Sequence, residues 1–155
     1  SNMIERAKKN YGEKNNSFRV EDITNPEAIL GNKYDTVLCV RVIINLGTLA
    51  NQLKALDNMR KLLRPGGALI LVDGFLDGFE QMSELREQLG IGPINPSKVN
   101  FYSSLADVLP EIEKHFEIEH TMHLGFFDLL TRVLYPSIVG EENVKRNSLL
   151  GVGYS

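Results

Sequence analysis

The clearest pattern along the chain is a pair of apolar runs separated by a stretch with helical spacing. Thr36 to Val40 and Ala68 to Val72 are nearly continuous in apolar residues, which is typical of strands buried on both faces of a parallel sheet. Between them, Thr48 is a suitable N-cap for a helix that ends near Pro65, Gly66 and Gly67. The apolar positions of this helix recur every three or four residues, at Leu49, Leu53, Leu56, Met59 and Leu63. Strand, helix and strand in this order predict a βαβ unit with a right-handed crossover.

Further elements are predicted on both sides of this unit. Ile4 to Tyr11 has the composition of a helix end closed by Gly12, and Phe18 to Ile23 suggests a short strand. After the unit, one amphipathic helix is expected to carry Phe79, Met82, Leu85 and Leu89. A second is expected to begin at Ser104 and to carry Leu105, Val108, Leu109 and Ile112.

The pattern changes again near the end of the chain. From Phe116 to His123, apolar and polar residues alternate with the period of two of a half-exposed strand. Phe126 to Tyr135 is expected to return antiparallel across the Leu124-Gly125 connection. The sequence therefore predicts an α/β fold, mostly a parallel sheet, that ends in an antiparallel β-hairpin.

Composition limits the function classes. The 155 residues are 43% hydrophobic, enough for one core, and we expect a single domain over residues 3–155 with residues 1–2 left by a tag. A net charge of -3 with mixed signs gives no indication of nucleic acid or an anionic membrane as partner. The single cysteine excludes a disulfide and suggests the cytoplasm, and no apolar stretch reaches the roughly 20 residues of a membrane span. The three histidines complete no metal cluster with Cys or carboxylates, so no metal is expected.

Three phrases in this order carry a resemblance: VEDIT, YDTVLCVRVIINL and LLRPGGALILVD. They resemble the later half of the class I S-adenosylmethionine (SAM)-dependent methyltransferases, over Met3 to about Ile138. RVIINL, LREQLG with the Asn100-Phe101-Tyr102 that follows it, and TRVLYP look like a bacterial subgroup that modifies small molecules or glycans. The resemblance implies an incomplete Rossmann-like fold, because the family's glycine-rich loop and the acidic residue after its second strand have no counterpart here. We expect the sequence to begin after both segments, as a fragment or a truncated gene product.

The resemblance also implies positions for the cofactor. Asp22 matches a carboxylate that accepts a hydrogen bond from the adenine amino group, while Ile23 covers the ring. By spacing alone a turn aspartate is favoured, and with the resemblance the adenine role is favoured. Cys39, Val40 and Arg41 end a strand at the sheet edge where such folds bind ligands, and the family uses this place to line the SAM pocket.

Other polar residues are candidates for the acceptor site. Arg41 is expected either to bind an acidic group of the substrate or to pair with Asp73, which ends the next strand and is itself a candidate. Asn45 matches a position that faces the acceptor, although a plain loop residue fits equally. The subgroup phrases add Arg86, Asn100, Tyr102 and Arg132, each of which alone is more often a solvated residue.

The expected function is SAM-dependent methylation of an oxygen or nitrogen on a small molecule or glycan, with an incomplete SAM site in this chain. No catalytic residue is assigned, since methyl transfer from a sulfonium needs alignment more than a general base. The alternative is a non-catalytic remnant that serves as an interaction module, and an unpaired apolar strand edge predicts a homo-oligomer. A nucleotide-binding domain of flavodoxin or dehydrogenase type is the third hypothesis, which the closing hairpin disfavours.

Overall fold

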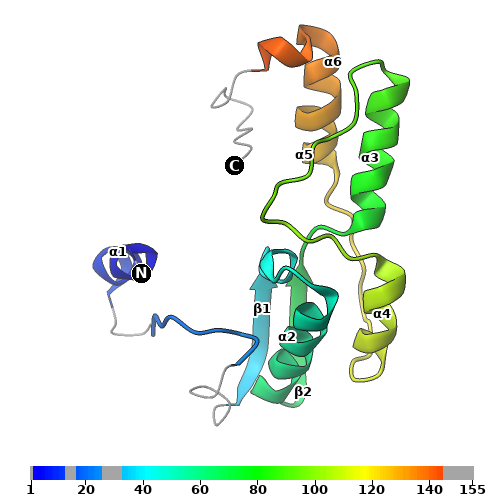
Figure 1. The fold of residues 1–155 in the computed structure, drawn as a ribbon. Coiled ribbons are helices and arrows are strands. Elements are labelled where there is room, and N and C mark those ends of the chain that lie inside the picture. The colour runs from blue at the N-terminus through cyan, green and yellow to red at the C-terminus, as the bar shows by residue number, and fades with distance from the viewer. Residues whose placement is uncertain (1, 13–16, 26–32, 145–155) are drawn as a thin grey trace.

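A computed structural model of the chain describes residues 2–12, 17–25 and 33–144 (Figure 1). The first part contains helix α1 (Asn2–Tyr11), and the predicted domain's last residues, 145–155, lie outside the described ranges. The remaining elements are β1 (Tyr34–Val40), the 3-10 turn η1 (Ile43–Asn45), α2 (Leu49–Leu62), β2 (Leu63–Val72), α3 (Leu76–Gln88), α4 (Leu105–Glu113), α5 (Phe126–Asp128), the π-helical η2 (Leu129–Leu134), α6 (Tyr135–Val139) and η3 (Glu141–Asn143).

The predicted βαβ unit is confirmed. Strands β1 and β2 are adjacent and parallel, with Thr36 opposite Ala68 and Val40 opposite Val72. Helix α2 contacts both strands and lies against one face of the sheet (Figure 1). Its N-cap is Thr48, whose Oγ1 accepts the backbone N–H of Asn51 at 3.2 Å. The helix therefore begins where the sequence predicts.

Pro65, Gly66 and Gly67, which were expected to separate the helix from the second strand, lie inside β2 and form a bulge. The register of the two strands shifts between Tyr34 and Thr36, and the extra residues lie on β2. Gly66 has φ 76°, which favours glycine. A Cβ on Gly67 would lie 3.0 Å from the carbonyl oxygens of Arg64 and Asp35, so the close approach of the two backbones also requires glycine.

Only one face of the sheet is covered by the described residues. Between the sheet and α2 lies a core of Cys39, Ile43, Ala55 and Met59. On the opposite face the side chains of Leu38, Val40 and Ile70 are 65%, 48% and 50% exposed. The prediction of strands buried on both faces is therefore wrong for the described residues, because a single crossover helix covers a single face.

Two predicted strands are not confirmed. Residues 17–22 form no strand and run into a turn, in which the N–H of Asn25 donates to the carbonyl of Asp22 at 2.9 Å. Residues 116–124 likewise form no strand. Residues 126–135, expected to complete the hairpin, are helical, as are the residues that follow up to 139.

The sequence explains why residues 126–139 form helices. Phe126, Leu129, Leu130, Val133 and Leu134 recur at intervals of three and four, and Val133 is fully buried. Pro136 falls in the first turn of α6, where proline is tolerated. Helix α3 contacts η2, so the two helical segments pack side by side (Figure 1).

The two other predicted helices are confirmed as α3 and α4. Ser104 caps α4 by accepting the N–H of Asp107 at 3.1 Å and donating its hydroxyl to the carboxylate of Asp107 at 2.8 Å. None of the helices in the described ranges has the length and apolar character that crossing a membrane would require.

Candidate functional site

The carboxyl ends of β1 and β2 meet at one edge of the sheet, and Arg41 follows directly after β1. Its N–H donates to the carbonyl of Val72 at 2.9 Å, which extends the pairing by one residue. Arg41 has φ 56°, unusual for a residue with a side chain, and its carbonyl accepts from Nδ2 of Asn45 at 2.7 Å. The chain thus turns sharply here and brings the exposed Arg41 and Asn45 to the same edge.

Asp73 follows β2 at this edge and binds backbone rather than Arg41. Its Oδ2 accepts the N–H of Ile44 at 3.3 Å, and its Oδ1 accepts the N–H of Gly74 at 2.9 Å. Of the two alternatives for Arg41, the ion pair with Asp73 is absent from the described residues. The Arg41 guanidinium instead lies close to Gly74, where an added Cβ would be 3.3 Å from Nη1.

A buried glutamine fixes the loop that lies over this edge. Nε2 of Gln52 donates to the carbonyls of Ile43 and Phe101, at 3.0 and 2.9 Å, and its Oε1 accepts the hydroxyl of Ser103. The N–H of Phe101 donates to the carbonyl of Ile44 at 2.7 Å. Residues 101–103 are therefore tied to the end of β1 at several points.

This loop carries Asn100 and Tyr102 to the site. Nδ2 of Asn100 donates to the hydroxyl oxygen of Tyr102 at 3.1 Å, and the Tyr102 ring packs against Phe79 with ring centroids 4.8 Å apart. An added Cβ at Gly74 would lie 3.4 Å from a ring carbon of Tyr102. Asn100 and Tyr102 thus lie beside Gly74, next to Arg41.

Asp22 and Ile23 lie near the core of the sheet. Ile23 packs against the buried cluster that contains Cys39, and its carbonyl accepts Nδ2 of Asn58 at 2.8 Å. Oδ1 of Asp22 accepts both the N–H and the hydroxyl of Thr24, which lowers the pKa of this exposed carboxyl. The turn geometry is thus present, and no residue in the described ranges donates a hydrogen bond to Oδ2.

Cys39 and Val40 differ in what they offer a ligand. The side chain of Cys39 is 2% exposed, and burial, followed by the negative charge of Asp73, raises the pKa of its thiol. Cys39 therefore lies in the core, and burial favours its thiol form. Val40 points to the exposed face of the sheet and offers apolar surface.

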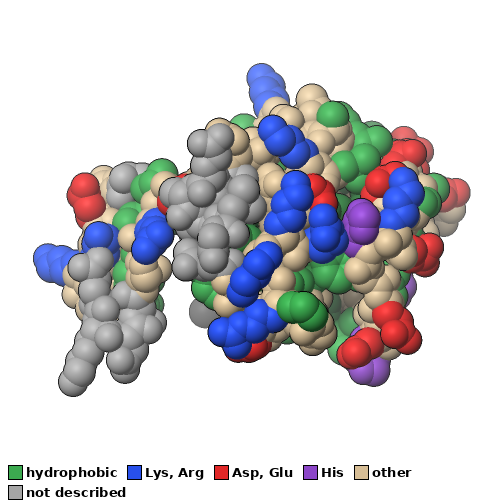
Figure 2. Space-filling model, turned by 90° about the horizontal axis from the view of Figure 1, so that it is seen from below, with side chains coloured by type: hydrophobic (Ala, Val, Ile, Leu, Met, Phe, Trp, Pro, Cys, Tyr) green, Lys and Arg blue, Asp and Glu red, His purple; other side chains and the backbone are tan. Residues whose placement is uncertain are grey.

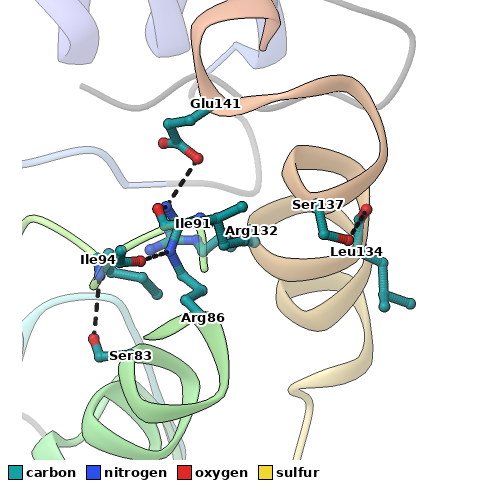
Figure 3. Close-up of polar contacts among 9 residues, drawn as sticks. Ser83, Arg86, Ile91, Ile94, Arg132, Leu134, Ser137 and Glu141 are labelled. Carbon is teal, nitrogen blue, oxygen red and sulfur yellow. Dashed lines mark hydrogen bonds and ion pairs between the residues drawn. The ribbon is translucent and has the colours of Figure 1, made fainter. Parts of the chain in front are cut away.

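Arg86 and Arg132 lie away from this edge, where α3 meets the helical segment 126–139 (Figure 3). Arg86 is 3% exposed, and its guanidinium donates to the carbonyls of Ile91, Gly92 and Arg132 and to the carboxylate of Glu141. Nε of Arg132 pairs with Asp128 at 2.8 Å. The structure therefore brings Arg41, Asn45, Asp73 and Asn100 together and leaves these two arginines elsewhere.

Sequence reasoning missed Gln52 and Ser103, which hold the site together. The signal for Gln52 was present, because it stands three residues after Leu49 and four before Leu56, on the apolar stripe of the helix. A polar residue on such a stripe is buried and must find partners. Within the described ranges no group of His, Cys, Asp and Glu is arranged to hold a metal ion.

Comparison with known families agrees with this arrangement. A family model described as a methyltransferase domain matches residues 1–119, which include both strands and every residue of the sheet-edge site. The chain therefore belongs to this methyltransferase domain family. The match ends before α5, so the helical segment lies beyond it. Searches of curated proteins and of solved structures found no match.

Proposed function

We propose that the chain takes part in SAM-dependent methyl transfer to an oxygen or nitrogen of a small-molecule or glycan acceptor. The observation that carries the proposal is the gathering of Arg41, Asn45, Asp73 and Asn100 at the carboxyl ends of adjacent parallel strands. Open α/β sheets bind their ligands at this edge. The match to the methyltransferase family supports the same reaction class.

The residues present fit the adenine end of the cofactor. Asp22 keeps its carboxylate at the surface, and no described residue donates to its Oδ2, which suits the adenine amino group as donor. Ile23 supplies apolar surface beside it and is held in place through Asn58, while Val40 offers apolar surface on the other face of the sheet. Among the described residues, those that fit the cofactor fit its adenine end.

SAM, when bound, supplies a methyl group on an already activated sulfonium. The protein then needs to align the acceptor and exclude water. The guanidinium of Arg41 forms no ion pair with any described residue, which suits an acidic group of the acceptor. Both oxygens of Asp73 already accept backbone N–H groups, so Asp73 shapes the edge and we assign no general base. We do not extend the acceptor site to Arg86 and Arg132, because they lie in another part of the fold.

Calorimetric titration with SAM and with its demethylated product tests this proposal. We expect saturable binding at micromolar concentration, weakened about tenfold by Asp22→Ala because a charged hydrogen-bond acceptor is lost. The matched control is Glu21→Ala, which removes the neighbouring exposed carboxylate and should leave affinity unchanged. Absence of binding at millimolar concentration would contradict the proposal.

A second candidate function is an interaction module without catalysis. The exposed apolar face of Leu38, Val40 and Ile70 favours it, as does the edge of β1 that pairs with no other described strand. In this case the chain associates with a second copy of itself. The same titration separates the two functions, since an interaction module would not bind SAM.

A further inference from the structure

A basic hollow lies at the opposite end of the sheet from the site described above. It has a volume of about 610 Å³ and is bounded by the β2 bulge, the end of α2 and the residues that follow α4. On the underside of the molecule, Lys and Arg side chains gather with a histidine beside them (Figure 2). The charged and titratable residues that line the hollow are Lys33, Arg60, Lys61, Arg64, Lys114 and His115.

None of the described residues that line the hollow is a carboxylate, and the carboxylates that pair with its cations do not balance them. Asp57 pairs with Arg60 at 2.9 Å and with Lys61 at 2.6 Å. Asp35 pairs with Arg64 at 2.7 Å, and Glu111 pairs with Lys114. Among the described residues, five cations thus face three paired carboxylates, which leaves a surplus of two positive charges without counting His115.

Lys33 is the cation without a carboxylate partner among the described residues. Its ammonium donates to the carbonyl of Lys61 in the last turn of α2, a position where the helix dipole favours a cation. This contact holds the charge at the hollow without neutralising it. The ion pairs of Arg64 and Lys114 are exposed, so either cation can turn to another anion at little cost.

We propose that this hollow binds a phosphate monoester group. A phosphate monoester carries a charge close to the surplus of two at neutral pH, and its oxygens accept the hydrogen bonds that Lys33, Arg64 and Lys114 can donate. The volume is in the range of small-molecule sites and leaves room for the body of a sugar phosphate. Because the hollow lies at the amino ends of the strands, this binding is separate from methyl transfer at their carboxyl ends.

Titration with inorganic phosphate and glucose 6-phosphate at low salt tests the site. We expect saturable binding that weakens as salt is added and that falls about tenfold in the double variant Lys33→Ala/Lys114→Ala. NMR signals of the Gly66 and Gly67 amides should shift during the titration, since both residues line the hollow. Lys98→Ala, which removes an exposed charge elsewhere, is the matched control and should bind as the unmodified chain does.

The source of the phosphate is distinguished by vesicles of phosphatidylcholine with and without phosphatidic acid, which also presents a phosphate monoester. Binding only to vesicles with phosphatidic acid, lost in the double variant, assigns the site to a lipid headgroup. Binding of glucose 6-phosphate without vesicle binding assigns it to a soluble ligand. Absence of both, or equal affinity in the double variant and the unmodified chain, overturns the proposal. SAM titration should be unaffected by the double variant, so this result is independent of the proposed methyl transfer.

Discussion

Arg86 is a cation that the fold has removed from water, with one carboxylate and three carbonyls in place of solvent. Its guanidinium donates four hydrogen bonds, which tie α3 to the loop after it, to the carbonyl of Arg132 in η2 and to Glu141 in η3 (Figure 3). Arg86→Ala should lower the free energy of unfolding by about 3 kcal/mol, since it leaves buried carbonyls without donors. Urea denaturation followed by circular dichroism measures this change.

Two further variants separate the role of the Arg86 hydrogen bonds from that of a helix substitution. Arg86→Lys should recover part of the stability, because an ammonium keeps the charge but cannot span all four acceptors. Gln88→Ala, at an exposed position of the same helix, should change stability by less than about 0.5 kcal/mol. A loss in Arg86→Ala no larger than in Gln88→Ala would show that the network does not stabilise the fold.

Cys39 gives a second prediction at the residue scale, from the raised pKa of its thiol. Burial is the main cause, so the folded thiol ionises above the ordinary 9.0 of the unfolded chain. The stability that this neutral thiol contributes is therefore fully present below about pH 9 and is lost as the pH rises through the raised pKa. At pH 8, alkylation by iodoacetamide should be slower on the order of tenfold in the folded chain than in urea. Equal rates would mean that the thiol is accessible.

Single residues show what the sequence could and could not reveal of the site. Asp73 was a candidate because it ends a predicted strand, and Asn45 because it matches a position that faces the acceptor in the resembled family. That both lie at one edge follows from topology, since the ends of parallel strands meet there. Arg86 was a candidate for the acceptor site because it falls in the phrase LREQLG, and a solvated position on an amphipathic helix was the alternative. Yet it stands four residues after Met82, on the apolar stripe, which is a signal for burial. Which carbonyls it meets depends on loops whose course no local pattern specifies.

At the scale of elements, α2 both connects the two strands and forms the main cover of the sheet. Thr48→Ala should lower the free energy of unfolding by about 1 kcal/mol, because the N–H of Asn51 loses its acceptor at the start of the helix. Thr48→Ser keeps the hydroxyl and should lie within a few tenths of the original stability. Thermal and urea unfolding of the two variants measure the difference, and equal loss in both would exclude the cap as the cause.

The predictable elements are those whose pattern allows one reading. The apolar runs of β1 and β2 and the helical spacing between them leave no competing periodicity, and the βαβ unit follows. Residues 126–139 are apolar at spacings that suit a helix, and the strand prediction rested on the alternating segment before them. A strand also requires a partner with free hydrogen-bonding groups, and local alternation in 116–123 says nothing about whether one is present.

At the scale of the whole molecule, two apolar surfaces have no cover among the described residues. One is the sheet face of Leu38, Val40 and Ile70, and the other is the side of α1 that carries Met3 and Tyr11, which are 79% and 73% exposed. A sheet is stable in water when both apolar faces are packed, and the described chain packs α2 on one of them only. Surfaces of this kind favour association with another copy through the hydrophobic effect.

Removing the apolar character of the sheet face should therefore weaken self-association. Sedimentation of the unmodified chain over a range of concentrations should show a concentration-dependent increase in mass. Leu38→Lys/Ile70→Lys should abolish this increase, because two charges in the interface would have to be desolvated without partners. Its unfolding free energy should change little, since both side chains already face water. The control Ile138→Lys removes another exposed apolar side chain, on α6, and should associate as the unmodified chain does. If the unmodified chain stays monomeric over the whole range of concentrations, this face does not bind a second copy.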